Sequence, residues 1–509
     1  MMRARHLVLS VAGASLIALC AATPLPAADA AAPGAKDAKA ESDINLPPFP
    51  ADKTAHFAMQ LGGQPLKYDA TVGSIPVLDE KGKTIAQVMY TAYTVPGANR
   101  PVTFALNGGP GASSVYLNLG AIGPKRVQFG ADGDSPSDPS GAVDNPGTWL
   151  DFTDLVFIDP VGTGFSHALV DEQESKKRFY TPKSDVEYLS RVVFDWLVKN
   201  ERLGSRKYFV GESYGGFRGP RIAHFLETRL GIALSGMVLV SPYLEPTATD
   251  GGDFSPLPWI VTLPSIAAAN LERQGRLTDA AMADVMAYAR SDYALDLLKG
   301  RSDPGALDRI VARVVALTGL DAGYVRRQGG RLDVASYLRE VHRDQGKIAS
   351  VYDSNVAGWD PFPYSARQRA NDPLLDGVVA PTTTAMVDFI TRQVGWKYAG
   401  RYNALSYEVN GMWKYTDDEG EDASVRHGSV EELRQVLAMD PKVEVLVAHG
   451  WDDLTCSFMT SVLIADQMPQ MGAAARMRVR EYPGGHMFYS RAASSQAFRA
   501  DVRALFGQH

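Results

Sequence analysis

The chain has 509 residues, of which 45% are hydrophobic and 21% are charged, an ordinary composition for a globular protein. This length corresponds to two or three average domains, or to one large α/β domain with an insertion. The formal net charge of -7 argues against a broad nucleic-acid interface, which would need a basic face.

The first thirty residues predict an export signal. Two arginines within the first five residues precede the apolar stretch 7–22, and two prolines and an Ala-Asp-Ala sequence follow it. A basic start, a short apolar middle and a small-residue end are typical of a secretory signal peptide, whereas a membrane span needs about 20 apolar residues. We therefore expect residues 1–30 to be removed and the protein to be secreted or periplasmic. The alternatives are an uncleaved anchor and lipidation at Cys20.

The segment that follows predicts no compact structure. Residues 31–54 start with an Ala-, Lys-, Asp-, Pro- and Gly-rich stretch and read as a flexible leader. The chain has two cysteines, Cys20 and Cys456, so processing would leave one and exclude an internal disulfide or a cysteine metal cluster. No later segment resembles a transmembrane helix, and we expect no stable membrane span after processing.

From about residue 55 onward, short apolar runs alternate with helical patterns. The runs are almost continuously apolar, which is typical of strands buried on both faces of a sheet. Helical patterns over 184–199 and 217–230 lie between them, and this alternation predicts a mainly parallel central sheet with helices on both faces, an α/β fold. The predicted strands are 83–92, 102–106, 155–158, 207–210, 237–240 and 443–448.

One block departs from this alternation. Residues 255–370 are mostly helical by periodicity, most clearly over 277–298, 304–317 and 332–343, with Gly and Pro breaks between the pieces. A helical block inserted between strands predicts a cap over the site; a purely structural support is the alternative. The catalytic domain would then comprise residues 55–254 and 371–509.

The sequence Gly-Glu-Ser-Tyr-Gly at 211–215 is the first chemical signal. An apolar strand leads into it and a helical pattern leads out, which is the context that a nucleophile elbow of an α/β-hydrolase needs. We predict Ser213 as the nucleophile; the alternative is an ordinary turn residue. A serine hydroxyl is a poor nucleophile at neutral pH and needs a base, which in turn needs an orienting acid.

The base and the acid are expected after the serine, in the order serine, acid, histidine. Asp452 and Asp453 directly follow the predicted strand 443–448, at the strand end where catalytic groups collect. His486 follows two glycines that permit a tight loop, and it is predicted as the base. The alternative for His486 is an ordinary loop histidine.

A glycine-rich segment, Asn-Gly-Gly-Pro-Gly-Ala-Ser-Ser at 107–114, follows the predicted strand 102–106. Its backbone N–H groups could stabilise a developing oxyanion, and we assign that role to the N–H groups of Gly109 and Tyr214. The segment lacks the Gly-Lys-Ser/Thr ending of a phosphate-binding loop, and the chain has no dinucleotide-binding or zinc-binding motif. No cofactor and no metal are therefore expected.

Three motifs together resemble one family. Asn-Gly-Gly-Pro-Gly-x-Ser-Ser, Gly-Glu-Ser-Tyr-x-Gly and Gly-Gly-His-Met occur in the order found in serine carboxypeptidases of the carboxypeptidase Y and cathepsin A type, and 159–166 is similar to a fourth shared segment. The resemblance spans about residues 60–505. It implies an exported hydrolase that removes C-terminal residues from peptides through an acyl-enzyme on Ser213.

The resemblance also implies roles for further residues. The family's acid stands three residues before a cysteine, which here is Asp453 before Cys456, with Asp452 as the alternative. The positions that bind the C-terminal carboxylate of the substrate match Asn107 and Glu212. Because two adjacent carboxylates repel unless one is protonated, peptide hydrolysis is expected to favour acidic pH.

The chain departs from the family at several positions. Ala112 stands where eukaryotic members usually have cysteine, and a second family glutamate falls near Ala121 by spacing. With the missing disulfides, these departures indicate a bacterial branch. Peptides are the expected partners, nucleic acid is not, and the sequence indicates no oligomeric state. An esterase or acyltransferase on the same triad, and a non-enzymatic binding protein, are the other hypotheses.

Overall fold

The computed structural model describes residues 47–97, 99–127, 141–250, 254–365, 369–416, 428–472 and 476–507. The predicted signal peptide and residues 31–46 of the predicted leader lie outside the described residues. Strand β1 begins at Lys53, so the last two residues of the predicted leader belong to the sheet. Among the described helices, none is both long and apolar enough to cross a membrane.

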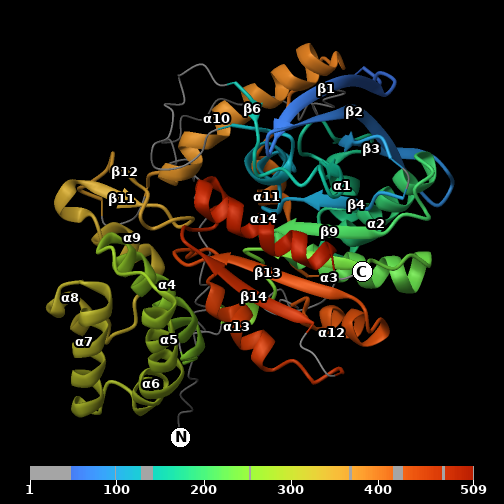
Figure 1. Cartoon of the computed structure of the whole chain (residues 1–509). Helices are drawn as coiled ribbons and strands as arrows, with labels where there is room; N and C mark the ends of the chain where they lie inside the picture. Colours follow the sequence, from blue (N-terminus) through green and yellow to red (C-terminus); the bar gives the residue numbers. More distant parts are fainter. Residues whose placement is uncertain are drawn as a thin grey trace, which may run out of the picture.

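A ten-stranded sheet forms the centre of the molecule (Figure 1). All neighbouring strands from β7 to β14 are parallel, which confirms the predicted mainly parallel sheet. In order across the sheet, the strands are β1 (Lys53–Leu61), β2 (Gln64–Leu78), β3 (Thr84–Thr94), β7 (Asp154–Ile158), β4 (Val102–Leu106), β9 (Lys207–Glu212), β10 (Gly236–Val240), β13 (Glu444–Gly450) and β14 (Met477–Tyr482), with β8 (His167–Ala168) paired to β3. Two short strands, β5 (Lys125–Arg126) and β6 (Val143–Asp144), pair separately.

The antiparallel pairs of the sheet all involve the first three strands: β1 with β2, β2 with β3, and β3 with both β7 and β8. Short connections explain the first two of these pairs. Only Gly62 and Gly63 separate β1 from β2, and a short turn over 79–83 separates β2 from β3. Such short connections can join only antiparallel strands, because a parallel crossover needs a dozen residues or more.

Helices cover both faces of the sheet, as predicted. Side chains alternate along the buried strands, so that Tyr208 and Val210 of β9 enter one core and Phe209 enters the other. The first core is completed by α14 (Ala492–Phe506), α10 (Pro373–Asp388) and the π-helical turns Leu117–Ile122 and Phe389–Val394. The second core is completed by α1 (Glu172–Phe179), α2 (Pro182–Lys199), α3 (Tyr214–Leu230) and α12 (Val430–Met439).

Between β10 and β13 the chain leaves the sheet and forms a helical block beside it (Figure 1). The block contains α4 (Leu257–Arg273), α5 (Asp279–Tyr288), α6 (Ala294–Lys299), α7 (Pro304–Thr318), α8 (Ala322–Gln328), α9 (Val334–Glu340) and the hairpin of β11 (Lys347–Ala349) and β12 (Ala357–Trp359). The predicted helical pattern over 277–298 corresponds to α5 and α6, the pattern over 304–317 corresponds to α7, and the pattern over 332–343 contains α9.

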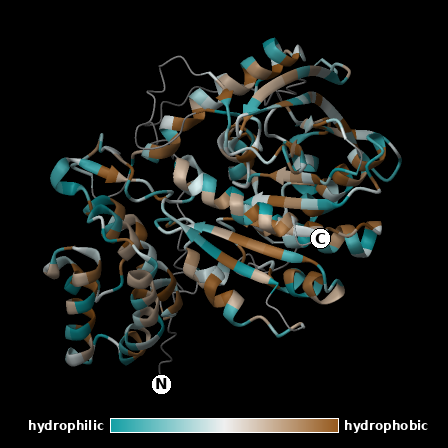
Figure 2. Cartoon of the chain, in the orientation of Figure 1, coloured by the Kyte–Doolittle hydropathy of each residue, from teal (hydrophilic) through white to brown (hydrophobic). Residues whose placement is uncertain are grey.

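The helical block has an apolar core of its own. Val261, Met282 and Val314 are buried in it, and in Figure 2 its helices show apolar and polar residues on different sides. This core continues into Trp451 and Phe458, which lie beside the predicted acid loop and in α13 (Phe458–Asp466). The block therefore packs on the segment that carries Asp453.

Candidate active site

The turn between β9 and α3 presents Ser213 in a strained conformation. Ser213 has φ 59° and ψ -122°, a backbone conformation that residues other than glycine rarely adopt. The turn is too compact for side chains at its flanking positions. A Cβ atom at Gly211 would lie 2.1 Å from the Gly215 oxygen, and one at Gly215 would lie 2.2 Å from the Leu106 oxygen. The glycines of the motif are therefore required for the turn itself.

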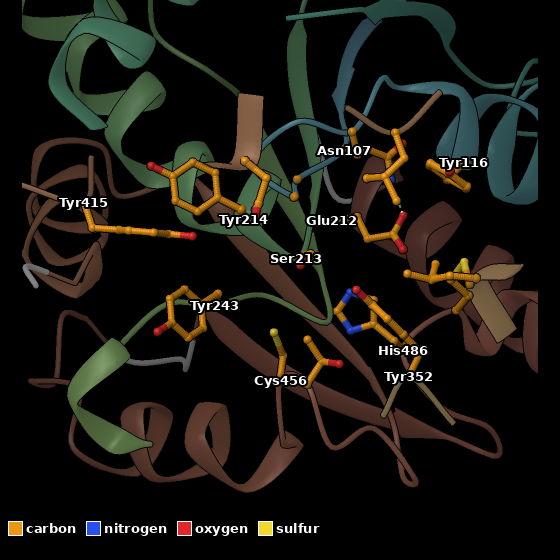
Figure 3. Close-up of a pocket in the computed structure, with 18 residues that line it drawn as sticks. Asn107, Tyr116, Glu212, Ser213, Tyr214, Tyr243, Tyr352, Tyr415, Cys456 and His486 are labelled. Carbon is orange, nitrogen blue, oxygen red and sulfur yellow. Dashed lines mark hydrogen bonds between the residues drawn. The ribbon is translucent and has the colours of Figure 1, made fainter. Parts of the chain in front are cut away.

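Ser213 opens into a cavity that the other predicted site residues, with the exception of Asp453, also line (Figure 3). His486 and Cys456 face the same space as Ser213, and the Ser213 hydroxyl lies within hydrogen-bonding reach of the Cys456 thiol. The remaining wall is largely aromatic and aliphatic. Its other members include Tyr116, Tyr243, Tyr352, Leu375, Leu405, Tyr415 and Met487.

His486 is held on three sides. Its Nδ1 atom lies 2.7 Å from Oδ2 of Asp453. Its backbone N–H donates to the Tyr352 carbonyl over 2.5 Å, and its own carbonyl accepts from the Ser241 hydroxyl over 2.9 Å. Burial alone would lower the pKa of His486, but the charge and hydrogen bond of Asp453, with the charge of Glu212, hold it above its ordinary value.

Asp453 is fully buried, and its two oxygens have separate partners. Oδ1 accepts from the backbone N–H groups of Thr455 over 2.8 Å and Cys456 over 3.0 Å. Oδ2 faces His486. The loop thus fixes the carboxylate with one oxygen directed at the imidazole.

Asp452, the alternative acid, lies on the other side of the loop. Its Oδ2 atom accepts from the Asn355 side chain over 3.1 Å, and its nearest cation is Arg491, 3.9 Å away. Burial, with the neighbouring Glu272, raises the pKa of Asp452 well above its ordinary value. Of the two aspartates, the structure places Asp453, and not Asp452, against His486.

Glu212 and Asn107 form a buried pair beside Ser213. The Asn107 amide donates to Oε2 of Glu212 over 2.7 Å (Figure 3). Asn107 is itself oriented by the N–H of Leu117, which donates to its Oδ1 over 2.9 Å. Burial raises the pKa of Glu212 to about 7, although His486, Tyr489 and Asn107 lower it. Tyr489, whose hydroxyl contacts both oxygens of Glu212, has no signal in the sequence beyond its place near His486.

The two predicted oxyanion donors border the same cavity. Gly109 and Tyr214 both line it. In the described part of the chain, the N–H of Gly109 donates to no backbone carbonyl, and Tyr214 is the first residue of α3, where an N–H has no acceptor within the helix. Gly108 permits this approach, because a Cβ atom there would lie 2.4 Å from the Tyr214 nitrogen.

The segment 159–166, which is similar to a fourth shared motif, supports the glycine-rich loop. Oδ1 of Asp159 accepts from the Ser114 N–H over 2.8 Å, and the Ser114 hydroxyl donates to the Ile158 carbonyl. Asp159 is buried, and burial raises its pKa to about 7. Its contribution is to the position of the loop, since it does not line the cavity.

A buried ion pair for which the sequence gives no signal stabilises the site. Arg218 donates to Asp185 through Nε over 2.5 Å and Nη2 over 3.2 Å, and through Nη1 to the Asn107 carbonyl over 2.7 Å. Its guanidinium lies 5.0 Å from the centre of the Tyr214 ring. Arg218 therefore fixes the start of α3 relative to the glycine-rich loop.

Replacing Arg218 with methionine is expected to lower the free energy of unfolding by about 3–5 kcal/mol, because it leaves Asp185 charged and buried without a partner. Burial already raises the pKa of Asp185 despite Arg218, so the loss should be smaller at acidic pH, where the carboxyl takes up a proton. Urea unfolding measures both effects. The double variant Arg218→Met, Asp185→Leu should recover most of the stability. If Arg218→Met alone is as stable as the wild type, the ion pair does not stabilise the site.

Among the described residues, no group of His, Cys, Asp and Glu side chains is arranged to hold a metal ion. Cys456 is buried and free.

Comparison with known proteins addresses the resemblance found in the motifs. Residues 64–256 match the family model described as serine carboxypeptidase, so the predicted resemblance is confirmed for this part of the chain. Serine carboxypeptidase-like 50 of Arabidopsis thaliana is 33% identical over 162 residues, which are 30% of this chain and 33% of that protein. The pheromone-processing carboxypeptidase KEX1 of Meyerozyma guilliermondii is 38% identical over 127 residues, 25% of this chain and 17% of that protein. The matches thus span a third or less of the length of these two relatives.

A solved structure shows the same fold over most of the chain. The prohormone-processing carboxypeptidase of Saccharomyces cerevisiae superimposes with a TM-score of 0.52 at 16% identity, covering 86% of this chain and 91% of that one. The predicted α/β-hydrolase fold is therefore confirmed. The superposition extends well beyond the residues that the family model matches.

Proposed function

We propose that this protein is a serine carboxypeptidase, which releases the C-terminal residue of a peptide through an acyl-enzyme on Ser213. The observation that carries the proposal is the Asn107–Glu212 pair, which is buried beside Ser213 and lines a cavity that His486, hydrogen-bonded to Asp453, also lines. The Asn107–Glu212 pair could bind the C-terminal carboxylate of a peptide, and the His486–Asp453 pair could transfer the proton of Ser213.

In the proposed mechanism, His486 Nε2 accepts the proton of the Ser213 hydroxyl as Oγ attacks the scissile carbonyl. The hydroxyl would turn from the Cys456 thiol to the imidazole when substrate binds, since such hydrogen bonds often form only in the complex. His486 then protonates the leaving amine, and water, activated by the same base, releases the acyl group. Asp453 keeps Nδ1 protonated, and the N–H groups of Gly109 and Tyr214 stabilise the oxyanion, each contributing about 2.7–4 kcal/mol.

Peptide-end specificity follows from the place of the carboxylate-binding pair. Glu212 and Ser213 line the same cavity, so a carboxylate bound by Glu212 would belong to the residue next to the bond under attack. Asn107 donates an N–H, and a protonated Glu212 can donate its O–H. The pair would therefore select the free C-terminal residue and exclude internal peptide bonds.

The direct test is incubation with a set of peptides that differ only in a free or an amidated C-terminus, followed by mass analysis of the products. We expect stepwise loss of single C-terminal residues from the free acids and slow cleavage of the amides. An esterase or acyltransferase using the same triad would not distinguish the two sets, so equal rates would overturn the carboxypeptidase proposal while leaving the nucleophile in place.

The pH dependence of peptide hydrolysis supplies a second expected result. With its pKa raised to about 7 by burial, Glu212 is protonated below that pH and can bind a carboxylate, whereas above it two carboxylates repel. The kcat/KM for peptides should therefore fall as pH rises through about 7, and that for an ester substrate without the carboxylate should fall less.

The matched control for this prediction is Glu212→Gln, which cannot titrate. It should flatten the upper limb of the peptide profile, while the lower limb, where His486 becomes protonated, should persist for both substrates. A wild-type peptide profile that is flat through neutral pH would refute this role of Glu212.

Export is part of the proposal as well, and it rests on the composition of residues 1–30. A secreted or periplasmic location and a bacterial source remain predictions of the sequence.

A further inference from the structure

A tyrosine hydroxyl contacts the buried carboxyl group of Glu212. The hydroxyl oxygen of Tyr489 lies 2.9 Å from both Oε1 and Oε2 of Glu212. Both side chains are buried, with Tyr489 2% exposed and Glu212 3% exposed. We propose that Tyr489 is a positioning residue, which orients the Glu212 carboxyl group toward the C-terminal carboxylate of a bound peptide. This inference rests on the proposed function.

The hydrogen bonds around Glu212 show why the orientation needs this hydroxyl. Asn107 donates to Oε2 over 2.7 Å, and the Tyr489 O–H reaches both oxygens. Oε2 therefore lies near two donors, Asn107 and Tyr489, whereas Oε1 lies near Tyr489 alone, whose one proton it shares with Oε2. When Glu212 is protonated, its proton belongs on Oε1, where fewer donors compete. Without Tyr489, only Asn107 would fix the rotation of the carboxyl group.

The hydrogen bond from Tyr489 to Glu212 can act in one direction only. Burial raises the pKa of the Tyr489 hydroxyl well above its ordinary value, so the hydroxyl stays protonated and acts toward the carboxylate only as a donor. Tyr489 thus favours the ionised form of Glu212 and brings no additional titrating proton.

Tyr489 also links the carboxylate-binding pair to the base. It lies three residues after His486, within the short 3-10 turn Phe488–Ser490, and Ser490 closes that turn by donating to the Met487 carbonyl over 2.9 Å. The same loop therefore positions both the imidazole and the Glu212 carboxyl group. A shift of this loop would change binding and proton transfer together.

The charged and titratable groups facing Glu212 define what a pH measurement reports. His486 and Asp453 act on it through their charges, and the Cys456 thiol and the Tyr116 hydroxyl are affected by it in turn. Tyr116 also acts on the Tyr489 hydroxyl, and removing that hydroxyl leaves all four groups chemically unchanged. A change in the titration of Glu212 in a Tyr489 variant is therefore assigned to the lost hydrogen bond.

The test compares Tyr489→Phe with Tyr482→Phe. The control residue is also a buried tyrosine, and its hydroxyl donates to Asp501 over 2.6 Å, away from Glu212. For Tyr489→Phe, we expect KM for free-acid peptides to rise about tenfold, the change that one hydrogen bond to a carboxyl group carries, with ester kcat almost unchanged. The upper limb of the peptide pH profile should move to higher pH, because the lost donor had favoured ionised Glu212. Tyr482→Phe should show neither change.

A readout without catalysis separates this inference from the proposed function. The infrared absorption of the Glu212 carboxyl group, isolated by subtracting spectra of Glu212→Gln, gives its titration directly. In Tyr489→Phe the midpoint should rise, and Tyr489→Met, which lacks the hydroxyl but has a flexible side chain, should show the same shift. An unchanged midpoint in a folded variant would overturn the role of Tyr489. Absence of peptide hydrolysis in the wild type would instead overturn the proposed function, and the infrared titration would still decide the contact.

Discussion

Replacing Ser213 with alanine is expected to lower kcat by about 10⁶ for peptides and esters alike, because a triad that acts as a unit loses nearly all of its contribution when the nucleophile is removed. The fold should remain, since Ser213 contributes no side-chain hydrogen bond to the start of α3. Alanine would have to adopt the same positive φ of 59°, so the strain of the elbow is unchanged.

Covalent labelling with a fluorophosphonate provides the measurement that is independent of substrate. The wild type should be labelled on Ser213, and Ser213→Ala should not be labelled. The informative control is Cys456→Ala, because Cys456 is the other nucleophilic side chain beside Ser213 in the cavity, and this variant should keep the labelling. Activity of Ser213→Ala near that of the wild type, or labelling that is lost only in Cys456→Ala, would end the serine mechanism.

The parts of the fold that the sequence predicts are those whose pattern depends on local burial. β4 and β9 are nearly continuous apolar runs because both faces of each strand are covered. β14 has no such apolar run and is not predicted from the sequence. It reads Met-Arg-Val-Arg-Glu-Tyr, lies at the edge of the sheet and is only partly buried, so its charged residues conceal it. An edge strand that keeps charges on its open side gives no apolar run to detect.

The residues of the candidate site also fall into two groups, those that a sequence motif reveals and those that only the fold brings together. Ser213 and His486 stand next to glycines in short motifs, so a pattern records them even though Gly215 and Gly485 meet backbone oxygens from distant parts of the chain. Arg218 contacts Asn107 across 111 positions, and Tyr489 contacts Glu212 across 277. Such contacts depend on packing between distant elements, and neither residue type is distinctive at its position.

The helical insertion contacts the loop that carries His486, which the helical periodicity of its sequence could not predict. The loop between β11 and β12 brings the Tyr352 carbonyl to the His486 N–H. Gly485 permits this contact, since a Cβ atom there would lie 2.0 Å from the Tyr352 oxygen. The insertion also lines the cavity through Tyr352. It therefore supports the loop of the predicted base as well as bordering the cavity, and its role as a cap stays a prediction.

Replacing Asp453 with asparagine is expected to lower kcat by about 10⁴. The direction follows from the two oxygens of Asp453. Oδ1 accepts two backbone N–H groups, from Thr455 and Cys456, so the oxygen of an asparagine would stay on that side and its amide NH₂ would face His486. Nδ1 would then have to accept a hydrogen bond, which places the imidazole proton on Nε2. In that tautomer Nε2 cannot take the proton from Ser213.

The matched control for this change is Asp452→Asn, one residue away in the same loop. Asp452 contacts Asn355 and lies near Arg491 rather than His486, so its amide should affect stability more than kcat. Pre-steady-state acylation rates for both variants, measured with an ester, separate the two aspartates. The imidazole N–H resonances of His486 should show the change of tautomer only in Asp453→Asn. An orienting carboxylate acts through its contact with the imidazole, so its loss must lower kcat. A 10⁴-fold loss in Asp452→Asn with little loss in Asp453→Asn would therefore assign the role of the acid to Asp452.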